Sequence, residues 1–327
     1  MKIAVFGAGA IGCWIGGRLA SGGADVTLVG RPRVIDELAS GLTVSELGDR
    51  TWTVKPTLAT DATTTRDAEV VLVTVKSAAT EEAAKELSGH TGTIVSLQNG
   101  IHNAQVLRAG LPGRLVLAGM VGFNVARVAP GHYHRGTSGD IVIEANPALE
   151  PLVLACRSAK LPIKPHANIV AVQWGKLVMN LNNAINALSG KPLLDELAER
   201  DFRRCLALTQ REALDVLEAA HQPVAKVLAL SARMVAKILP MPDWAFRLVA
   251  YRFASVDPKA RSSMQDDFAA GRASEIDYLQ GEIVQLAKRV ARPAPINEKL
   301  VALVRAAEAG GKRDFSGSEL LAELRSP

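Results

Sequence analysis

A glycine-rich loop near the start of the chain constrains the fold more than any other feature of the sequence. The loop consists of Gly7, Ala8, Gly9, Ala10, Ile11 and Gly12. It follows a short β-branched run and opens a helical stretch. In such a GxGxxG pattern the glycines permit a tight turn and let the backbone approach a pyrophosphate, which binds at the helix N-terminus. The loop therefore predicts dinucleotide binding; a related fold with a degenerate site is the alternative.

The first half of the chain alternates apolar runs with helical stretches. The runs predict buried strands at residues 2–6, 25–29, 70–75, 93–98 and 115–119. The stretches between them predict helices at residues 11–21, 33–39, 78–87 and 103–108. This alternation is typical of a doubly wound parallel sheet. Two segments depart from it: residues 42–54, with a Gly48-Asp49 turn, and residues 131–144, which we expect to form a hairpin.

The strand pattern ends near residue 167, after a segment that contains Pro162 and Pro165, and helical periodicity continues to the end. A chain of 327 residues is long for one core and sufficient for two. We therefore expect an α/β domain of the Rossmann type at residues 1–165 and an all-α domain at residues 166–327.

Composition and spacing exclude several classes of protein. Lysine and arginine are scattered and aromatic residues make up 4%, so the net charge of +5 favours small anionic ligands, or a diffuse surface charge, over nucleic acid. No uncharged run approaches the roughly 18 residues that a membrane span requires. Three isolated cysteines indicate a reduced, cytoplasmic protein. His132 and His134 have no third ligand at metal spacing, so no metal site is predicted.

The end of the second predicted strand bears on the choice of nucleotide. NAD-binding sites place a carboxylate about 20 residues past the glycine motif, on the ribose 2′-hydroxyl. This chain has Gly30-Arg31 there and no acid. Because arginine pairs well with phosphate, Arg31 predicts NADP(H). A solvated surface arginine is the alternative.

Polar residues end two further strands. Lys76 follows residues 70–75, and Gln98 and Asn99 close the strand at residues 93–98. Ligands of open α/β sheets bind at the carboxyl ends of the strands. The coincidence predicts a cofactor and substrate cleft, although an exposed lysine and a plain turn explain each feature taken alone.

A polar stripe interrupts the apolar, helix-length stretch at residues 174–190. On an α-helix Lys176, Asn180 and Asn183 lie within about 40° of one direction, Asn186 about 80° to one side, and Asn182 on the opposite face. A buried amide without a partner costs about 1–3 kcal/mol, and an ammonium group costs more. The stripe is therefore either the wall of a ligand pocket or a hydrogen-bonded seam against another helix.

Two serine-containing motifs occur later in the helical half. Ser263 belongs to a Ser-Ser-Met motif, and Ser274 precedes Glu275. Ser274 resembles the N-cap of a helix with Asp277 at its third position. On that interpretation Glu275 only compensates the helix dipole.

Taken together, these motifs resemble the ketopantoate reductase, or 2-dehydropantoate 2-reductase, family over nearly the whole chain. The resemblance rests on GAGAIG at Gly7, Gly30-Arg31, Lys76, QNG at Gln98, WGKLVMN at residues 174–180, SSM at Ser262 and SEIDYLQGEIVQLA from Ser274. It implies NADPH-dependent reduction of the ketone of 2-dehydropantoate to (R)-pantoate, a step toward pantothenate and coenzyme A.

The resemblance also implies roles for individual residues. Lys176 is expected to be the general acid, and Glu275 a catalytic carboxylate that contacts substrate or cofactor. The substrate residues implied are Asn99, Asn180 and Ser263. The cofactor residues implied are Gly7, Ala8, Gly9, Ala10, Ile11, Gly12, Arg31, Lys76, Gln98, Asn99, Ala126 and Glu275.

This chain departs from the family pattern at two positions. The family commonly places a second substrate asparagine eight residues after the lysine, where Ala184 stands here. Asn183 is the natural substitute, and Asn186 takes its place if the helix is irregular. Asp266 stands where glutamine is frequent. These departures keep two alternatives open: a reductase of another 2-keto acid or opine-type substrate, and an NADPH-binding sensor without catalysis.

Beyond a small keto acid and the cofactor, the sequence points to one further partner, a second copy of the chain. The apolar, basic segment at residues 224–253 could suit a membrane surface, but Pro240 and Pro242 interrupt it. We expect two core-packing helices there. A homodimer through this helical region is the alternative use of the same apolar surface.

Overall fold

The computed structural model describes the chain except residues 49, 227–229, 251–260 and 327. The chain forms two compact units, Met1–Ile169 and Val170–Pro327. The division expected from the sequence lies slightly earlier, at residue 165. Each unit is described by itself below.

Unit 1 is built on an eight-stranded sheet with the order β12-β11-β8-β7-β6-β1-β2-β5. Its strands are β1 (Lys2–Phe6), β2 (Asp25–Val29), β5 (Thr57–Ala59), β6 (Val70–Val73), β7 (Thr93–Ser96), β8 (Val116–Val121), β11 (Ile141–Glu144) and β12 (Ile163–His166). Neighbouring strands are parallel, except for β8 with β11. The predicted doubly wound sheet is confirmed, and β5, β11 and β12 extend it.

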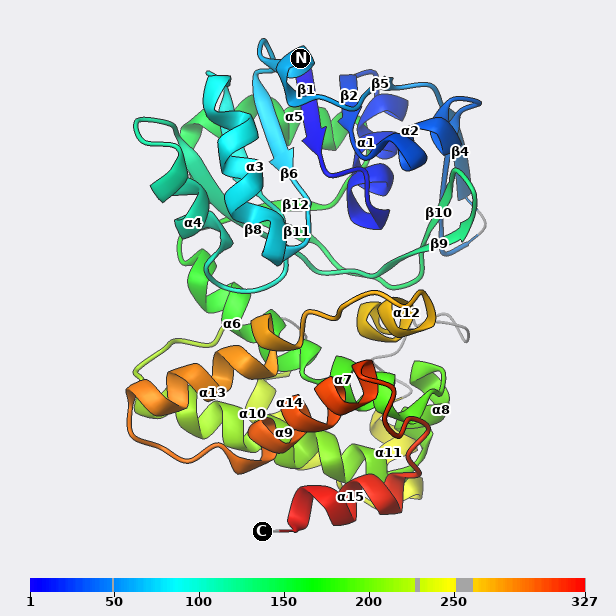
Figure 1. Ribbon diagram of the computed structural model, residues 1–327, viewed down its shortest axis with the longest axis vertical. Helices are drawn as coiled ribbons and strands as arrows, with labels where there is room; N and C mark the ends of the chain where they lie inside the picture. The colour runs from blue at the N-terminus through cyan, green and yellow to red at the C-terminus, as the bar shows by residue number, and fades with distance from the viewer. Residues whose placement is uncertain (49, 227–229, 251–260, 327) are drawn as a thin grey trace. The chain divides into compact units, whose positions relative to one another are not determined.

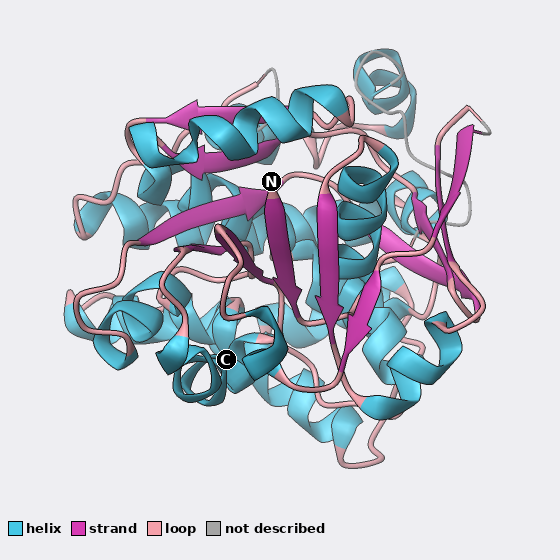
Figure 2. Ribbon diagram, turned by 90° about the horizontal axis from the view of Figure 1, so that it is seen from above, coloured by secondary structure: helices cyan, strands magenta, loops and turns pink. Residues whose placement is uncertain are grey.

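Helices cover both faces of this sheet (Figures 1 and 2). They are α1 (Ala10–Ser21), α2 (Pro32–Leu38), α3 (Thr80–Glu86), α4 (Asn103–Gly110) and α5 (Glu150–Ser158), with short turns η1 (Ala62–Thr65), η2 (Ser77–Ala79), η3 (Leu87–Gly89) and η4 (Pro147–Leu149). Side chains alternate between faces along a strand. Val5 accordingly packs in a core with α1 and α5, and its neighbour Ala4 in a second core with α3 and α4.

A smaller sheet with the order β4-β3-β10-β9 packs against α1. Its strands are β3 (Leu42–Glu46), β4 (Arg50–Val54), β9 (Val125–Ala129) and β10 (His132–Arg135). The expected hairpin at residues 131–144 is wrong, because β10 pairs with β3 and β9 whereas β11 pairs with β8 and β12. Between β10 and β11 the chain passes so close to Gly122 that a Cβ added to Gly139 would lie 2.2 Å from the Gly122 carbonyl oxygen. Here the chain leaves the smaller sheet and enters the larger one.

Within its described residues unit 2 contains helices joined by loops and no strand, as predicted. They are α6 (Ile169–Asn180), α7 (Asn182–Ser189), α8 (Leu193–Ala198), α9 (Arg200–Ala219), α10 (Ala232–Ile238), α11 (Asp243–Ala250), α12 (Ser263–Ala269), η5 (Ile276–Tyr278), α13 (Gln280–Arg289), α14 (Pro295–Glu308) and α15 (Gly317–Arg325). The long helix α9 contacts α7, α8, α10, α13, α14 and α15, and its side chains Phe202, Cys205 and Leu217 are fully buried. It is therefore the axis around which the unit packs.

The apolar segment at residues 224–253 lies partly outside the described residues. Within the described part, α10 packs on α9 and buries Ala236. On α11, by contrast, Trp244 is 71% exposed and Leu248 70% exposed. Core packing is therefore observed for α10 but not for these two side chains. No helix among the described residues has the length and apolar character to cross a membrane.

Two substitutions in the glycine loop test how tightly α1 is packed. An added Cβ at Gly12 would lie 2.2 Å from the Gly7 carbonyl oxygen, whereas one at Gly9 would meet no atom within 4 Å. We expect Gly12→Ala to lower the free energy of unfolding by about 1–3 kcal/mol. Gly9→Ala, the matched control, meets no atom and should cost less, about 0.5 kcal/mol, because alanine is only a poorer N-cap than glycine. Urea unfolding followed by circular dichroism measures both, and equal losses would contradict the packing argument.

Candidate functional site

The glycine loop is held from both sides by neighbouring strands. Gly7 has φ +116°, and the N–H groups of Gly7 and Ala8 both donate to the carbonyl of Val29, at 2.9 Å. Just after β6, the Thr74 hydroxyl donates to the Gly7 carbonyl at 2.7 Å. The loop follows β1, which lies between β2 and β6 in the sheet. The chain goes first to β2 on one side of β1 and later to β6 on the other side. Ligands of doubly wound sheets bind at such a switch point.

The N-terminus of α1 is suited to an anion. Gly9 is its N-cap, and within the described residues neither a capping side-chain bond nor an acidic side chain occupies its first turn. The first N–H groups of a helix have no partner within the helix, and they carry partial positive charge. Open space around Gly9 leaves room for the backbone to approach a ligand. The loop thus fits the pyrophosphate of a dinucleotide.

Arg31 lies at the end of β2, beside the glycine loop. It is exposed and forms the N-cap of α2. The preceding residue, Gly30, approaches Ala8 so closely that an added Cβ would lie 2.5 Å from the Ala8 Cβ. This close contact brings the end of β2, and with it the backbone before Arg31, against the loop.

The loops after β6 and β7 are joined by hydrogen bonds. The Ser77 hydroxyl donates to the Asn99 carbonyl at 3.0 Å, and the Asn103 amide donates to the same carbonyl at 2.5 Å. Lys76, next to Ser77, is exposed, and Asn99 is half-buried. The structure therefore brings Lys76 and Asn99 together at the carboxyl edge of the sheet.

Two other predicted cofactor residues are placed differently. The Gln98 side chain is buried, donates to the Thr80 hydroxyl at 2.8 Å and accepts from the Ser96 hydroxyl at 3.0 Å. Its amide therefore holds the loop together. Ala126 is exposed on β9, at the edge of the smaller sheet. That strand contacts α1 but does not belong to the sheet that carries the glycine loop.

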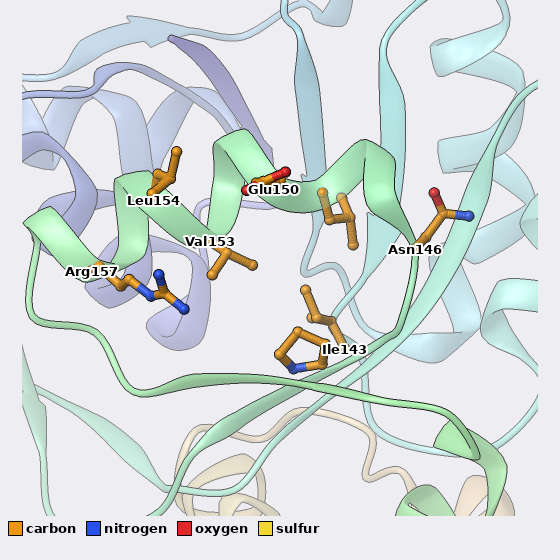
Figure 3. A pocket seen from close by; sticks show the side chains of 8 residues that line it. Ile143, Asn146, Glu150, Val153, Leu154 and Arg157 are labelled. Carbon is orange, nitrogen blue, oxygen red and sulfur yellow. The ribbon is translucent and has the colours of Figure 1, made fainter.

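Unit 1 also has a surface cavity of about 170 Å³ beside α5. It is lined by Ile143, Val153, Arg157 and their neighbours (Figure 3). None of the residues predicted to bind substrate or cofactor lines it.

In unit 2 the polar stripe occupies two helices. Lys176, Asn180 and Asn183 are half-buried, whereas their neighbours Leu177 and Ala184 are buried. Burial lowers the pKa of Lys176 to about 8, because removal from water disfavours the charged ammonium. The stripe therefore presents a lysine that gives up its proton more easily than an ordinary one.

The stripe bends at Leu181, between α6 and α7, and two buried glutamines bind carbonyls there. Gln280 donates to the Leu181 carbonyl at 2.8 Å, and Gln210 donates to the Val178 carbonyl at 3.2 Å. Sequence reasoning missed both glutamines. In the sequence each glutamine is recognisable only as a polar residue at a buried position of an amphipathic helix. That pattern does not identify the group to which its side chain is hydrogen-bonded.

Asn186 belongs to a buried seam. Its Nδ2 donates to the Lys191 carbonyl at 2.9 Å and to Glu196 Oε2 at 2.6 Å, while its Oδ1 accepts from the Ser262 N–H at 2.9 Å. Asn182 is also buried. The expected hydrogen-bonded seam is therefore observed at Asn186, whereas Asn180 and Asn183 remain partly accessible.

Glu196, which sequence reasoning missed, is fully buried on α8. Burial raises the pKa of Glu196 to about 8, although the amides of Asn186 and Asn182 oppose the rise by favouring the carboxylate. The same physical cause thus shifts the pKa of this acid upward and that of Lys176 downward.

Ser263 and Glu275 lie at the starts of two short elements. Ser263 is exposed and is the first residue of α12, and Glu275 is half-buried at the N-cap of η5. The expected helix start at Ser274 is wrong, because α13 begins only at Gln280. Asp277, the expected third position of that helix, instead pairs with Arg305 at 2.6 Å. Glu275 is therefore not in the first turn of an α-helix.

Asp266 lies one turn after Ser263 on α12. It is half-buried, and burial raises the pKa of its carboxyl. An acid thus stands close in sequence to a predicted substrate residue, where the family commonly has glutamine.

Known proteins resemble this chain over nearly all its length. The family described as "Ketopantoate reductase PanE/ApbA" matches residues 3–148, and its C-terminal counterpart matches residues 168–308. The 2-dehydropantoate 2-reductase of Halobacterium salinarum is 31% identical over 95% of this chain and 100% of its own length.

Solved structures share the fold. A PanE/ApbA family ketopantoate reductase from Ralstonia eutropha is 30% identical and matches with a TM-score of 0.80, covering 95% of this chain and 99% of that one. A D-mandelate dehydrogenase solved with NADH and anilino(oxo)acetate is 20% identical, with a TM-score of 0.76 over 95% of this chain and 99% of that one.

The buried acid makes stability depend on pH. Folded Glu196 keeps its proton up to about pH 8, whereas the unfolded chain loses it near the ordinary value of 4.5. The folded state therefore binds more protons across this window, and the free energy of unfolding falls as pH rises through it. We expect Glu196→Gln to remove that fall. The melting temperature of the variant minus that of the wild type should therefore increase from pH 5 to pH 8 and stay constant above pH 8.

Thermal melts at several pH values check this expectation. Asp195→Asn, at an exposed neighbour, is the control and should shift the melting temperature equally at every pH. A constant difference between Glu196→Gln and the wild type would show that Glu196 does not titrate in this window.

Proposed function

The chain belongs to the ketopantoate reductase family, and we propose that it reduces the ketone of 2-dehydropantoate to (R)-pantoate with NADPH. The family is one of nicotinamide-dependent oxidoreductases. In this proposal residues 1–165 bind the cofactor, and residues 166–327 carry the catalytic residues and most of the substrate contacts. The observation that carries the proposal is a half-buried lysine with a lowered pKa beside two partly accessible asparagines. The product leads toward pantothenate and coenzyme A.

Lys176 is the general acid of the proposed reaction. NADPH, when bound, supplies the hydride to the ketone carbon. The carbonyl oxygen then gains negative charge and requires a proton donor. With a pKa of about 8, Lys176 is protonated at neutral pH yet releases its proton more readily than an exposed lysine. Glu275 is the second catalytic group, a carboxylate that contacts substrate or cofactor.

Neutral polar side chains hold the substrate. Asn99, Asn180, Asn183 and Ser263 can bind a carboxylate and a hydroxyl without adding a competing acid. We assign the second family asparagine to Asn183, because the Asn186 amide is already bonded to protein groups on both its atoms.

A reductase of another 2-keto acid or of an opine-type substrate is the second candidate. Ala184, buried in place of the family's asparagine, and the half-buried Asp266 favour it. A panel of keto acids compared by kcat/KM with NADPH decides between the candidates. An NADPH-binding sensor is a third candidate, and it predicts cofactor binding with no oxidation for any member of the panel.

We also propose a cytoplasmic homodimer that pairs through unit 2. The three cysteines are free and buried, which suits a reducing compartment. Trp244, Leu248 and Met241 expose apolar surface on and just before α11, which suits pairing of two copies. Sedimentation measures the assembly state.

Loss of the Lys176 ammonium should abolish turnover but not cofactor binding. We expect Lys176→Ala to lower kcat by about 10²–10⁴-fold, the usual contribution of a general acid, with the Kd for NADPH unchanged. In the wild type kcat/KM should fall about tenfold per pH unit above about 8, as the lysine loses its proton. Lys288→Ala, at an exposed position on α13, is the control. Normal turnover by Lys176→Ala would refute the mechanism.

Arg31 should determine the preference for NADPH over NADH. We expect Arg31→Ala to raise the KM for NADPH by about 10–100-fold, since a charge-assisted bond to phosphate is lost, and to leave the KM for NADH nearly unchanged. Arg114→Ala is the control. Arg114 is exposed just before β8, at the amino ends of the parallel strands, whereas the glycine loop and Arg31 lie at their carboxyl ends. An equal rise for both cofactors would contradict a 2′-phosphate contact.

A further inference from the structure

We propose that Asn186, Glu196 and Ser262 form a clasp whose role is to position the substrate-binding residues Asn183 and Ser263. The proposal rests on the proposed function, which assigns substrate contacts to Asn183 and Ser263. We call these three residues the α7–α12 clasp. They are positioning residues and do not themselves contact the substrate.

Asn186 is the centre of the clasp. It is fully buried, and both atoms of its amide are bonded: two hydrogens go to the Lys191 carbonyl and Glu196, and the oxygen accepts the Ser262 N–H. The carbonyl and the N–H group fix which way the amide faces. Gly190, with φ +66°, turns the chain so that Lys191 returns to this amide. Asn186 thus links the end of α7 to the start of α12.

Glu196 holds the Asn186 amide from the side of α8. Within the described residues its second oxygen, Oε1, has no hydrogen-bond partner, so its burial carries a cost. An apolar residue of similar size would avoid that cost. Unlike an apolar residue, however, Glu196 accepts a hydrogen bond from Asn186 Nδ2 on its Oε2, at 2.6 Å. This pattern favours orientation of Asn186 over stability as the role of Glu196.

Ser262 transmits this orientation to both substrate residues. It is 1% exposed, and its hydroxyl accepts the Gln265 N–H at 3.2 Å, which caps α12. The same hydroxyl donates to the Asn183 carbonyl at 3.4 Å. Ser263 follows directly and is exposed. One serine therefore fixes the backbone of Asn183 and the start of the helix that carries Ser263.

The kinetic test compares Asn186→Ala with a buried asparagine outside the clasp. We expect Asn186→Ala to raise the KM for the keto acid about tenfold while kcat changes less than about threefold, since Lys176 is untouched. Asn297→Ala is the control, because Asn297 is also fully buried and bonds a carboxylate, Glu212, at 2.8 Å. It should lower the melting temperature comparably but leave KM unchanged.

A double-mutant cycle separates positioning from general loosening. In a background that lacks both positioned side chains, Asn183→Ala with Ser263→Ala, Asn186→Ala should raise KM by less than about threefold, because the residues that it positions are already gone. If the effects simply multiply, Asn186 does not act through Asn183 and Ser263 and the proposal is overturned.

Substitutions at Glu196 provide a rescue test. Glutamine keeps an oxygen that can accept from Asn186, so Glu196→Gln should retain the wild-type KM, whereas Glu196→Ala should reproduce the Asn186→Ala effect. A raised KM in Glu196→Gln, or a normal one in Glu196→Ala, would argue against the clasp.

Hydrogen exchange tests the clasp without any substrate. In Asn186→Ala the amides of Ser262 and Gln265 should exchange at least about tenfold faster, whereas in Asn297→Ala they should not. Failure of the wild type on every keto acid would refute the proposed function alone. Unchanged exchange at these amides would refute the clasp alone.

Discussion

Every buried polar group on α6 and α7 needs a hydrogen-bond partner, and the arrangement of unit 2 follows from how those partners are supplied. Gln280 binds the carbonyl of Leu181, at the bend, and Gln210 binds the carbonyl of Val178, one turn before it. Asn186 is bonded by α8 and by the start of α12. Helices that are distant in sequence are thus brought to one polar seam, whereas Lys176, Asn180 and Asn183 remain partly accessible.

Burial also sets the chemistry of the two ionisable groups in this region. Removal from water disfavours the charged form of both Lys176 and Glu196, so the pKa of the lysine falls to about 8 and that of the glutamic acid rises to about 8. The lysine thereby gives up its proton more readily than an exposed one. The glutamic acid stays protonated and uncharged below about pH 8, which lets it bind Asn186 without leaving a charge in the core.

In unit 1 the corresponding constraint is steric. Gly7, Gly12 and Gly30 lie where an added Cβ would collide with neighbouring backbone or side-chain atoms. These close approaches bring the ends of β1, β2 and β6 together around the N-terminus of α1. The result is a helix N-terminus whose N–H groups suit an anion, because within the described part of the chain neither a capping nor an acidic side chain occupies its first turn.

The sequence by itself determined the features that depend on local periodicity and spacing. These include the βαβ alternation, the glycine loop and the place of Arg31 after β2. Tertiary structure decided which groups meet. It separated β10 from β11, committed the Gln98 amide to Thr80, started α13 at Gln280 instead of Ser274, and placed the unforeseen Glu196 against Asn186. The reason is physical: strand or helix periodicity is set by near neighbours in the chain, whereas the partner of a buried polar group is chosen by packing between segments far apart in sequence.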